Sequence, residues 1–386
     1  MPIKHNKFYL KNVRERYQKS TKKLKTAILS EFCVNSGYSR KHASRILTGA
    51  LEPRRARPGP KLKYNSDEFL RYLKFFWDSM NRMCGKNMVA ALPVWLPKYS
   101  EKIPNKILKE LLQISASTID RRLKLYKNTK PKGLSSTVAS YLKNRIPVRT
   151  LDAHAECPGV VNADTVAHCG TSLSGDFANS LTIVDLYSAW TVNRAIWKKE
   201  AIPTLKQIKK AESLFPFAWL EFFSDNGNEF INYELEKYLI KRTAPINFKR
   251  TRAYKKNDAC YVEQRNYTHV RKIMDYKRIG ERELVGLMNE IYLVYWNPLQ
   301  NFFTPTIKME KKERIGSKIK KTYSKPKTPY QRLIECDYLP QAQKNLLKRQ
   351  FANLDPFFLK RELDKKLKIL MEKIEESNRR TDDRVA

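Results

Sequence analysis

The sequence has few acidic residues, no clustered cysteines and no long apolar runs. Its 39 Asp and Glu residues stand against 76 Lys and Arg, a formal net charge of +37. The six cysteines are scattered over 386 residues without a C-x-x-C pair, so neither a disulfide framework nor a structural zinc site is readable. No uncharged run approaches the roughly 18 to 20 residues of a membrane span, and the first twenty residues lack the apolar centre of a signal peptide. We therefore expect a soluble cytoplasmic protein with reduced thiols and no membrane partner.

The chain is nevertheless 41% hydrophobic and 11% aromatic, enough for a large core in two or three domains. Its positive charge is concentrated at the two ends. The net charge is +25 over residues 1–150, +2 over residues 151–300 and +10 over residues 301–386. Such basic surface attracts nucleic acid through its phosphates, whereas a membrane surface is more usually met by an amphipathic helix or a lipid anchor. We expect the two ends to bind DNA, which would place the bound protein at the nucleoid.

The first third opens with a pattern typical of a helix-turn-helix. Two sets of apolar residues at helical spacing flank the turn NSGYS, which offers Ser39 as an N-cap: Leu24, Ile28, Leu29 and Phe32, then Ala43, Ile46 and Leu47. The second helix would expose Arg40, Lys41 and Arg45 to phosphates and base edges. An ordinary helical hairpin with solvated charges is the alternative. The proline-rich stretch that follows, with Arg54 and Arg55, is either a basic arm for a minor groove or a linker.

A second helix-turn-helix pattern lies in IPNKILKELLQISASTIDRRLKLYK. Its last helix would display Arg121, Arg122 and Lys124, and two modules in tandem imply a long DNA site read in two parts. The resulting domain prediction is a helix-turn-helix with a basic arm over 1–63, a second DNA-binding region over 64–130, a linker over 131–150, a core over 151–300 and a basic, mainly helical region over 301–386.

The middle third predicts an α/β core. Three adjacent β-branched segments, beginning at Gly159 and ending in TVNRAIW, read as strands. They are followed by a helix over 203–214, a strand over 219–223, a helix over 232–241, a strand over 246–250 and a long helix from about 258. This order predicts a mixed five-stranded sheet flanked by helices, the ribonuclease H-like order.

Three carboxylates lie in that core at positions that suit a metal site. Asp164 lies in the first strand, Asp225 directly after the fourth, and Glu263 near the start of the long helix. Neighbouring strands can bring them together, and carboxylate oxygens are the ligands that Mg²⁺ or Mn²⁺ prefers. Two such ions can activate an attacking oxygen and stabilise the leaving oxygen of a phosphodiester. An ordinary turn at Asn226 and Gly227 is the alternative explanation for Asp225.

Four blocks, PGVVNADTVAHCG, SDNGNEFIN, YKKNDACYVEQRNYTHVR and NFFTPTIKM, resemble a bacterial insertion-sequence transposase family with an integrase catalytic core. This is the D,D,E class related to retroviral integrases, and the resemblance runs from the first helix-turn-helix to about Leu359. It implies a ribonuclease H-like fold with Asp164, Asp225 and Glu263 as the metal-binding triad. The family often has an acid where this chain has Asn162, to which we assign no metal role. Unlike retroviral integrases, the chain has no amino-terminal His/Cys zinc module.

Residues beside the triad carry weaker predictions. Asn266 shares a helix face with Glu263 and could hold substrate or orient the carboxylate, while Arg265, Arg271 and Lys272 could hold phosphates or simply be solvated. His168 and Cys169 are not expected to be catalytic, because adjacent strand residues point to opposite faces and a catalytic cysteine needs a base in reach. Glu229 could compete as a ligand, but an acid before a helix is also favoured by the helix dipole.

The last third combines a basic stretch, KKERIGSKIKKTYSKPKTPYQRL, with an amphipathic helix pattern from Pro356. The basic stretch is predicted to be poor in strands and either lies along DNA or is a solvated loop. The tail ESNRRTDDRVA is predicted to be disordered. The sequence thus predicts a transposase that binds its element's ends and target DNA, uses two Mg²⁺ or Mn²⁺ ions, transfers 3′-hydroxyl ends and forms a homo-oligomer on DNA. A DNA-binding regulator with an idle core and a stand-alone nuclease are the alternatives.

Overall fold

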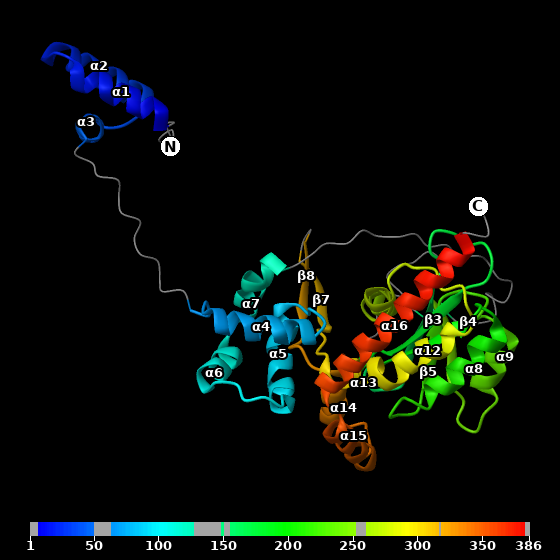
Figure 1. Ribbon diagram of the computed structural model, residues 1–386. Coiled ribbons are helices and arrows are strands. Elements are labelled where there is room, and N and C mark those ends of the chain that lie inside the picture. Colours follow the sequence, from blue (N-terminus) through cyan, green and yellow to red (C-terminus); the bar gives the residue numbers. More distant parts are fainter. Residues whose placement is uncertain are drawn as a thin grey trace. The chain divides into compact units, whose positions relative to one another are not determined.

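The computed structural model describes residues 7–49, 63–126, 148–149, 155–251, 260–315 and 318–382, and the chain divides into two compact units, residues 1–63 and 64–386 (Figure 1). The first unit holds three helices, α1 (Lys7–Lys19), α2 (Lys22–Ser36) and α3 (Arg40–Thr48). The predicted turn separates α2 from α3, with Gly37 in the left-handed region at φ 67°. The helix α1 was not predicted, and Leu24, expected in the core, is 55% exposed.

The small core of this unit lies where the three helices meet. Phe32, Ala43 and Leu47 are its most buried side chains. The guanidinium of Arg14 on α1 donates hydrogen bonds to the carbonyl of Ile46 at 3.0 and 2.7 Å, which ties the first helix to the end of α3. The unpredicted helix therefore completes the core that the other two begin.

The second unit begins with a helical region, built from α4 (Asp67–Ser79), α5 (Gly85–Trp95), the short η1 (Leu96–Lys98), α6 (Asn105–Gln113), α7 (Ala116–Leu123) and the short η2 (Lys124–Tyr126). The helices α6 and α7 are the predicted second pair. The hydroxyl of Ser115 accepts a hydrogen bond from the amide of Thr118 and caps α7. The start of α5 packs closely on α7, because a Cβ at Gly85 would lie 2.2 Å from the carbonyl of Ala116.

This helical region shares its core with the rest of the second unit. The indole of Trp95 donates a 3.0 Å hydrogen bond to the carbonyl of Phe303, 208 residues later. Phe76 and Trp95 also contact the ring of Phe357 at centroid distances of 6.0 and 5.1 Å. Buried aromatic contacts of this kind stabilise a single packed body. The region is therefore built into the unit that carries the sheet.

The sheet has six strands in the order β1-β6-β5-β2-β3-β4. They are β1 (Val148–Arg149), β2 (Val160–Ala167), β3 (Ala178–Asp185), β4 (Thr191–Trp197), β5 (Glu221–Ser224) and β6 (Asn247–Thr251). The strands β2, β3 and β4 are antiparallel, while β5 runs parallel to β2, and β6 parallel to β5. The five long strands were all predicted; β1 was not, and it lies in the segment predicted as a linker.

Helices complete the α/β arrangement. They are α8 (Ala201–Glu212), α9 (Tyr233–Ile240), a helix formed by α10 (Cys260–Arg265), η5 (Asn266–Arg271) and α11 (Lys272–Met274), and a second one formed by α12 (Leu284–Glu290), η6 (Ile291–Trp296) and α13 (Asn297–Phe303). The segments η5 and η6 are π-helical turns. The second long helix packs on β4 and is itself covered by α16 (Figure 1). Every residue of β3 is buried, so the sheet is covered on both faces.

Three asparagines from the second long helix close the open edge of β4. Asn289, Asn297 and Asn301 each accept a hydrogen bond from a strand N–H and donate one to the carbonyl of the same strand residue, at 2.8 to 3.2 Å. The strand residues are Thr191, Asn193 and Ala195. The side-chain amides thus take the place of a neighbouring strand, and the edge is protected from pairing with another chain.

The C-terminal part corrects two predictions. The basic stretch forms a β-hairpin, β7 (Met309–Ile315) with β8 (Lys318–Tyr323), where a strand-poor segment was expected. After α14 (Pro329–Glu335) and α15 (Gln341–Asn353), the helix α16 (Pro356–Asp382) continues through most of the tail predicted to be disordered. Leu363, Leu370 and Ile374 lie in the core, as the amphipathic pattern predicted. Within the described ranges, no helix is long and apolar enough to cross a bilayer.

Candidate active site

Two of the predicted carboxylates lie at matched positions on neighbouring parallel strands. Ala163 of β2 pairs with Ser224 of β5, and the next residues along the two strands are Asp164 and Asp225. Their side chains are close enough for each to affect the charge of the other. Two acids that are far apart in the sequence are therefore brought together by the register of one strand pair.

Asp164 is held in an environment that disfavours a lone negative charge. Burial, and then the charge of Asp225, raise the pKa of Asp164 to about 7. The backbone amide of Thr165 opposes this shift by donating a 2.7 Å hydrogen bond to Oδ1 of Asp164. Without a bound cation, the pair consequently tends to retain a proton near neutral pH.

In the part of the chain that the structure describes, Lys199 brings an ammonium group within reach of these acids. Nζ of Lys199, in the loop after β4, is 2.7 Å from Oε1 of Glu229, which is only 3% exposed. The same oxygen accepts a 2.9 Å hydrogen bond from the hydroxyl of Thr165. Burial alone would lower the pKa of Lys199, but Glu229, Asp225 and Asp164 together raise it. Lys199 is thus the positive charge that balances this cluster of acids.

The turn after β5 is shaped around these contacts. Oδ1 of Asp225 accepts a 3.1 Å hydrogen bond from the amide of Gly227, and the side-chain amide of Asn226 reaches the carbonyl of Thr251 at 3.2 Å. A Cβ at Gly227 would lie 2.4 Å from the carboxylate of Glu229, so a larger residue there would displace that buried carboxylate from its present position. Glu229 lies before Asn232, the N-cap of α9, and its burial is explained by the ion pair rather than by the helix dipole.

The long helix supplies the third side of the site. The side-chain amide of Asn266 donates a 2.6 Å hydrogen bond to Oδ2 of Asp164. Glu263 lies one turn earlier on the same helix and is exposed, and a spacing of three residues puts it on the same face as Asn266. Asn266 also begins the π-helical turn η5, a distortion that is frequent at functional sites.

The structure therefore joins Asp164, Asp225 and Asn266, while Glu263 remains one helical turn away from them. In the ranges that the structure describes, no three His, Cys, Asp or Glu side chains lie close enough to hold a metal ion together. Two polar groups nearby are unsatisfied. The side-chain amide of Asn162 and Oδ1 of Asn266 are buried and have no hydrogen-bond partner. A carboxylate pair beside unsatisfied amide oxygens is a donor set that suits a hydrated divalent cation.

Other residues named from the sequence have structural contacts. The guanidinium of Arg271 donates to the carbonyl of Ala167 at 3.0 Å and lies over the ring of Tyr276, so it ties the helix to β2. Lys272 is exposed, with its ammonium 6.0 Å from the ring centroid of Tyr267. His168 is buried and shares a 2.7 Å hydrogen bond with Ser180.

The predicted DNA-reading residues are mostly exposed. Arg40, Lys41 and Arg45 lie on the surface of α3, and Arg121 and Lys124 on the surface at the end of the α6–α7 pair, whereas Arg122 is half-buried. Arg54 and Arg55 lie outside the described residues, so their predicted role in a basic arm stays a prediction.

Sequence reasoning missed the role of Lys199 and underrated Glu229. Lys199 follows Lys198 in a charged loop with no motif, and nothing local distinguishes the two. For Glu229 the nearest signal, Asn226-Gly227, indicates an ordinary turn and does not point to a buried acid.

No family model matches the sequence. The chain is 32% identical over 332 residues to the uncharacterized protein y4rM of Sinorhizobium fredii (strain NBRC 101917 / NGR234), and the alignment covers 82% of this chain and 92% of that protein. Among solved structures, the chain is similar to a chain of the simian T-cell lymphotropic virus intasome in complex with PP2A regulatory subunit B56 gamma. The TM-score is 0.28 and the identity 12%, over 45% of this chain and 57% of that one, less than two thirds of its length.

Proposed function

This chain belongs to the same family as the uncharacterized protein y4rM, and we propose that it is a DNA transposase of the D,D,E class. It would bind the ends of a mobile element, cleave a DNA strand there and join the released 3′-hydroxyl to a target phosphodiester. The observation that carries this proposal is the placement of Asp164 and Asp225 at matched positions of β2 and β5, closed on a third side by the helix that bears Glu263.

The strand order supports a ribonuclease H-like core. Three antiparallel strands, β4, β3 and β2, continue into the parallel strands β5 and β6, and the two acids stand at the join between the two groups. Helices cover both faces. The α/β arrangement is compatible with that fold. It puts the acids where antiparallel strand pairing gives way to parallel strand pairing.

The donor set fits Mg²⁺ or Mn²⁺, and Asp164, Asp225 and Glu263 would hold two such ions. When bound, the ions lower the barrier to phosphodiester attack by polarising the attacking and leaving oxygens. The protein's own residues orient and balance the carboxylates. Asn266 positions Oδ2 of Asp164, and Lys199, paired with the nearby Glu229, offsets the negative charge of these acids.

Double-stranded DNA is the partner that the charge distribution favours. The first 150 residues carry a net charge of +25, and the surfaces of α3 and α7 expose arginine and lysine. Two element ends must be handled together for joining, so we propose a homo-oligomer assembled on DNA. Phosphate contacts supply affinity, and side chains of the two helix pairs would supply the choice of sequence.

A strand-transfer assay tests this proposal. The full-length protein would be incubated with a labelled duplex ending in the inverted repeat that flanks its gene, a supercoiled plasmid and Mg²⁺ or Mn²⁺. We expect donor DNA joined covalently to the plasmid through its 3′ end. Nicked donor without joined product would indicate a stand-alone nuclease. Tight binding of the repeat without nicked or joined product with either ion would indicate a regulator with an idle core.

A further inference from the structure

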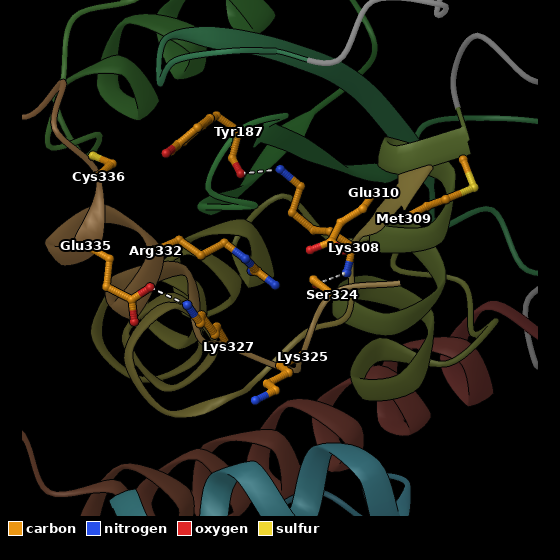
Figure 2. A pocket seen from close by; sticks show the side chains of 10 residues that line it. All are labelled: Tyr187, Lys308, Met309, Glu310, Ser324, Lys325, Lys327, Arg332, Glu335 and Cys336. Carbon is orange, nitrogen blue, oxygen red and sulfur yellow. Dashed lines mark hydrogen bonds and ion pairs between the residues drawn. The ribbon is translucent and has the colours of Figure 1, made fainter. Parts of the chain in front are cut away.

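A cavity of about 660 Å³ lies away from the carboxylate pair, at the base of the β7–β8 hairpin. Its walls come from the loop after β3, the two ends of the hairpin and α14. Figure 2 shows the side chains of Lys308 and Arg332 extending into it from opposite sides, with Lys325 and Lys327 along the lower edge. We call it the basic cavity. Four of the lining residues, Ser324, Lys325, Lys327 and Arg332, lie in the basic stretch that was predicted either to lie along DNA or to be a solvated loop, but none was named as a site residue.

The two central cations of the basic cavity are bonded to neutral oxygens. The ammonium of Lys308 donates to the carbonyl of Tyr187. The guanidinium of Arg332 donates to the carbonyl of Ser188 at 3.2 Å, to the hydroxyl of Thr306 at 2.8 Å and to the carbonyl of Thr306. Neither cation forms an ion pair in the described part of the chain. The carboxylate of Glu335 is already paired with Lys327.

The two central cations of the basic cavity repel one another. Burial, and then the charge of Arg332, lower the pKa of Lys308 to about 8. Burial lowers the pKa of Arg332 to about 10. The charge of Asp185 raises the pKa of Lys308, but burial and the charge of Arg332 outweigh it.

The chemistry of the basic cavity fits a phosphate group. A phosphate brings negative charge and several acceptor oxygens to an ammonium and a guanidinium that lack an anionic partner. Lys325 is exposed on the wall and has no ion pair in the described residues, so it can add a further donor. Glu310 and Glu335 on the rim do not cancel four lining cations, Lys308, Lys325, Lys327 and Arg332.

The surroundings favour a phosphate that belongs to a DNA backbone. The hairpin above the basic cavity, residues 309–323, contains six Lys or Arg and two Glu. Free phosphate would need only the cavity, whereas a polyanion would also use the charged hairpin. We propose that the basic cavity seats one backbone phosphate of DNA while the β7–β8 hairpin lies along the same duplex. The choice of DNA rests on the proposed function, but the anion chemistry of the basic cavity does not.

The test compares full-length variants in two measurements. Lys308→Gln removes the central ammonium, and Lys325→Gln removes an exposed one that forms no ion pair in the described residues. Lys368→Gln is the matched control, because Lys368 is 80% exposed on α16 and does not line the basic cavity. The first measurement is fluorescence anisotropy of a labelled 30-base-pair duplex across a salt series. The second is the unfolding temperature in sodium phosphate against sodium chloride of equal ionic strength.

We expect each cavity variant to bind the duplex about 10-fold more weakly at low salt. The plot of log affinity against log salt should also become less steep by about 0.9, because one phosphate contact is lost. Lys368→Gln should keep the wild-type affinity and the wild-type slope. Phosphate should raise the unfolding temperature of the wild type and the control more than that of Lys308→Gln.

Three results would overturn the proposal. If the cavity variants keep the wild-type salt slope while phosphate still protects the wild type selectively, the basic cavity takes small anions and not DNA. If neither measurement separates them from the control, the basic cavity binds no phosphate. If poly-glutamate but not phosphate protects the wild type selectively, its ligand is an acidic protein. Failure of the wild type to bind any duplex would instead count against the transposase, and the phosphate measurement would still stand.

Discussion

The amide of Asn266 donates a 2.6 Å hydrogen bond to Oδ2 of Asp164, a contact between residues 102 positions apart. It fixes the helix that carries Glu263 against β2. The other oxygen of Asp164, Oδ1, accepts a hydrogen bond from the amide of Thr165, so both oxygens are held in place. The side-chain amide of Asn266 thus orients the carboxylate of Asp164. It also holds the helix that carries Glu263, the proposed partner of Asp164 in metal binding.

Asn266→Ala should therefore reduce strand transfer by about 10- to 100-fold, the usual effect of removing a group that orients a metal ligand. Binding of the duplex should be unchanged, since Asn266 is uncharged and contacts Asp164 rather than contributing one of the exposed cations. The activity is measured as joined product per unit time, and binding by anisotropy. Asn266→Ser, which keeps a donor on a shorter side chain, should recover part of the activity. Full activity in Asn266→Ala would show that Asn266 does not orient Asp164 for the reaction.

The three carboxylates are predicted to be individually essential. Asp164→Asn, Asp225→Asn and Glu263→Gln should each lower cleavage and joining by several orders of magnitude with DNA affinity nearly intact, because the amide keeps the shape and loses the charge that holds a cation. Asp176→Asn, an exposed acid paired with Lys198, is the control. Substantial Mg²⁺-dependent activity in any one of the three would exclude that residue from the metal site.

Lys199→Met should destabilise the second unit by about 1 to 3 kcal/mol, since it leaves the buried carboxylate of Glu229 without its cation. The double variant Lys199→Met with Glu229→Gln should recover most of that loss. All six tryptophans lie between residues 77 and 296, so tryptophan fluorescence reports unfolding of this unit alone. Lys198→Met, whose partner Asp176 is on the surface, should change little. Equal losses in the single and double variants would argue against the ion pair.

The raised pKa of Asp164 predicts a pH dependence of stability in protein kept free of divalent ions. A carboxyl whose folded pKa lies above its unfolded value stabilises the fold at low pH, and that contribution is lost as the pH rises through the folded pKa. Between pH 4 and pH 8 the wild type should thus lose about 1 to 3 kcal/mol relative to Asp164→Asn. Added Mg²⁺ at pH 8 should stabilise the wild type and not the variant. If the difference in unfolding free energy between the wild type and Asp164→Asn does not change with pH, the environment described for Asp164 is wrong.

The division of the chain predicts how fragments behave. Residues 1–63 should fold alone as a helical unit and bind DNA with an affinity that falls steeply with salt. Residues 64–150 should be largely unfolded, because Trp95 and Phe76 lose the partners that Phe303 and Phe357 provide. Circular dichroism and anisotropy measure the two properties. A cooperatively folded fragment 64–150 would show that the second helix pair needs no sheet domain.

The sequence was sufficient for elements whose signal is local. Alternation and β-branching located β2, β3 and β4, helical spacing located α2 and α16, and position after a strand located Asp225. The hairpin β7–β8 was missed because its strands consist mainly of charged residues and do not alternate, although Gly316-Ser317 between them is a hairpin signal.

What the sequence could not provide depends on contacts between distant segments. Thr165, Lys199 and Glu229 come from a strand and two loops, and their meeting follows only from the packed sheet. The same holds for Asn297 and Asn301, whose spacing is that of any helix until β4 lies against them. Corrections at Leu24 and in the C-terminal tail have the same origin, because packing and not local composition decides which face is covered.

The hydrogen bond from Trp95 to Phe303 has a consequence for how this protein would measure DNA. The second helix pair and the acids at Asp164 and Asp225 belong to one packed body, so the interval between them is fixed by side chains and not by a tether. A duplex bound by Arg121 and Lys124, as proposed above, would be presented to the carboxylates at one distance. Cut sites should then fall at a constant number of base pairs from the bases that α7 contacts.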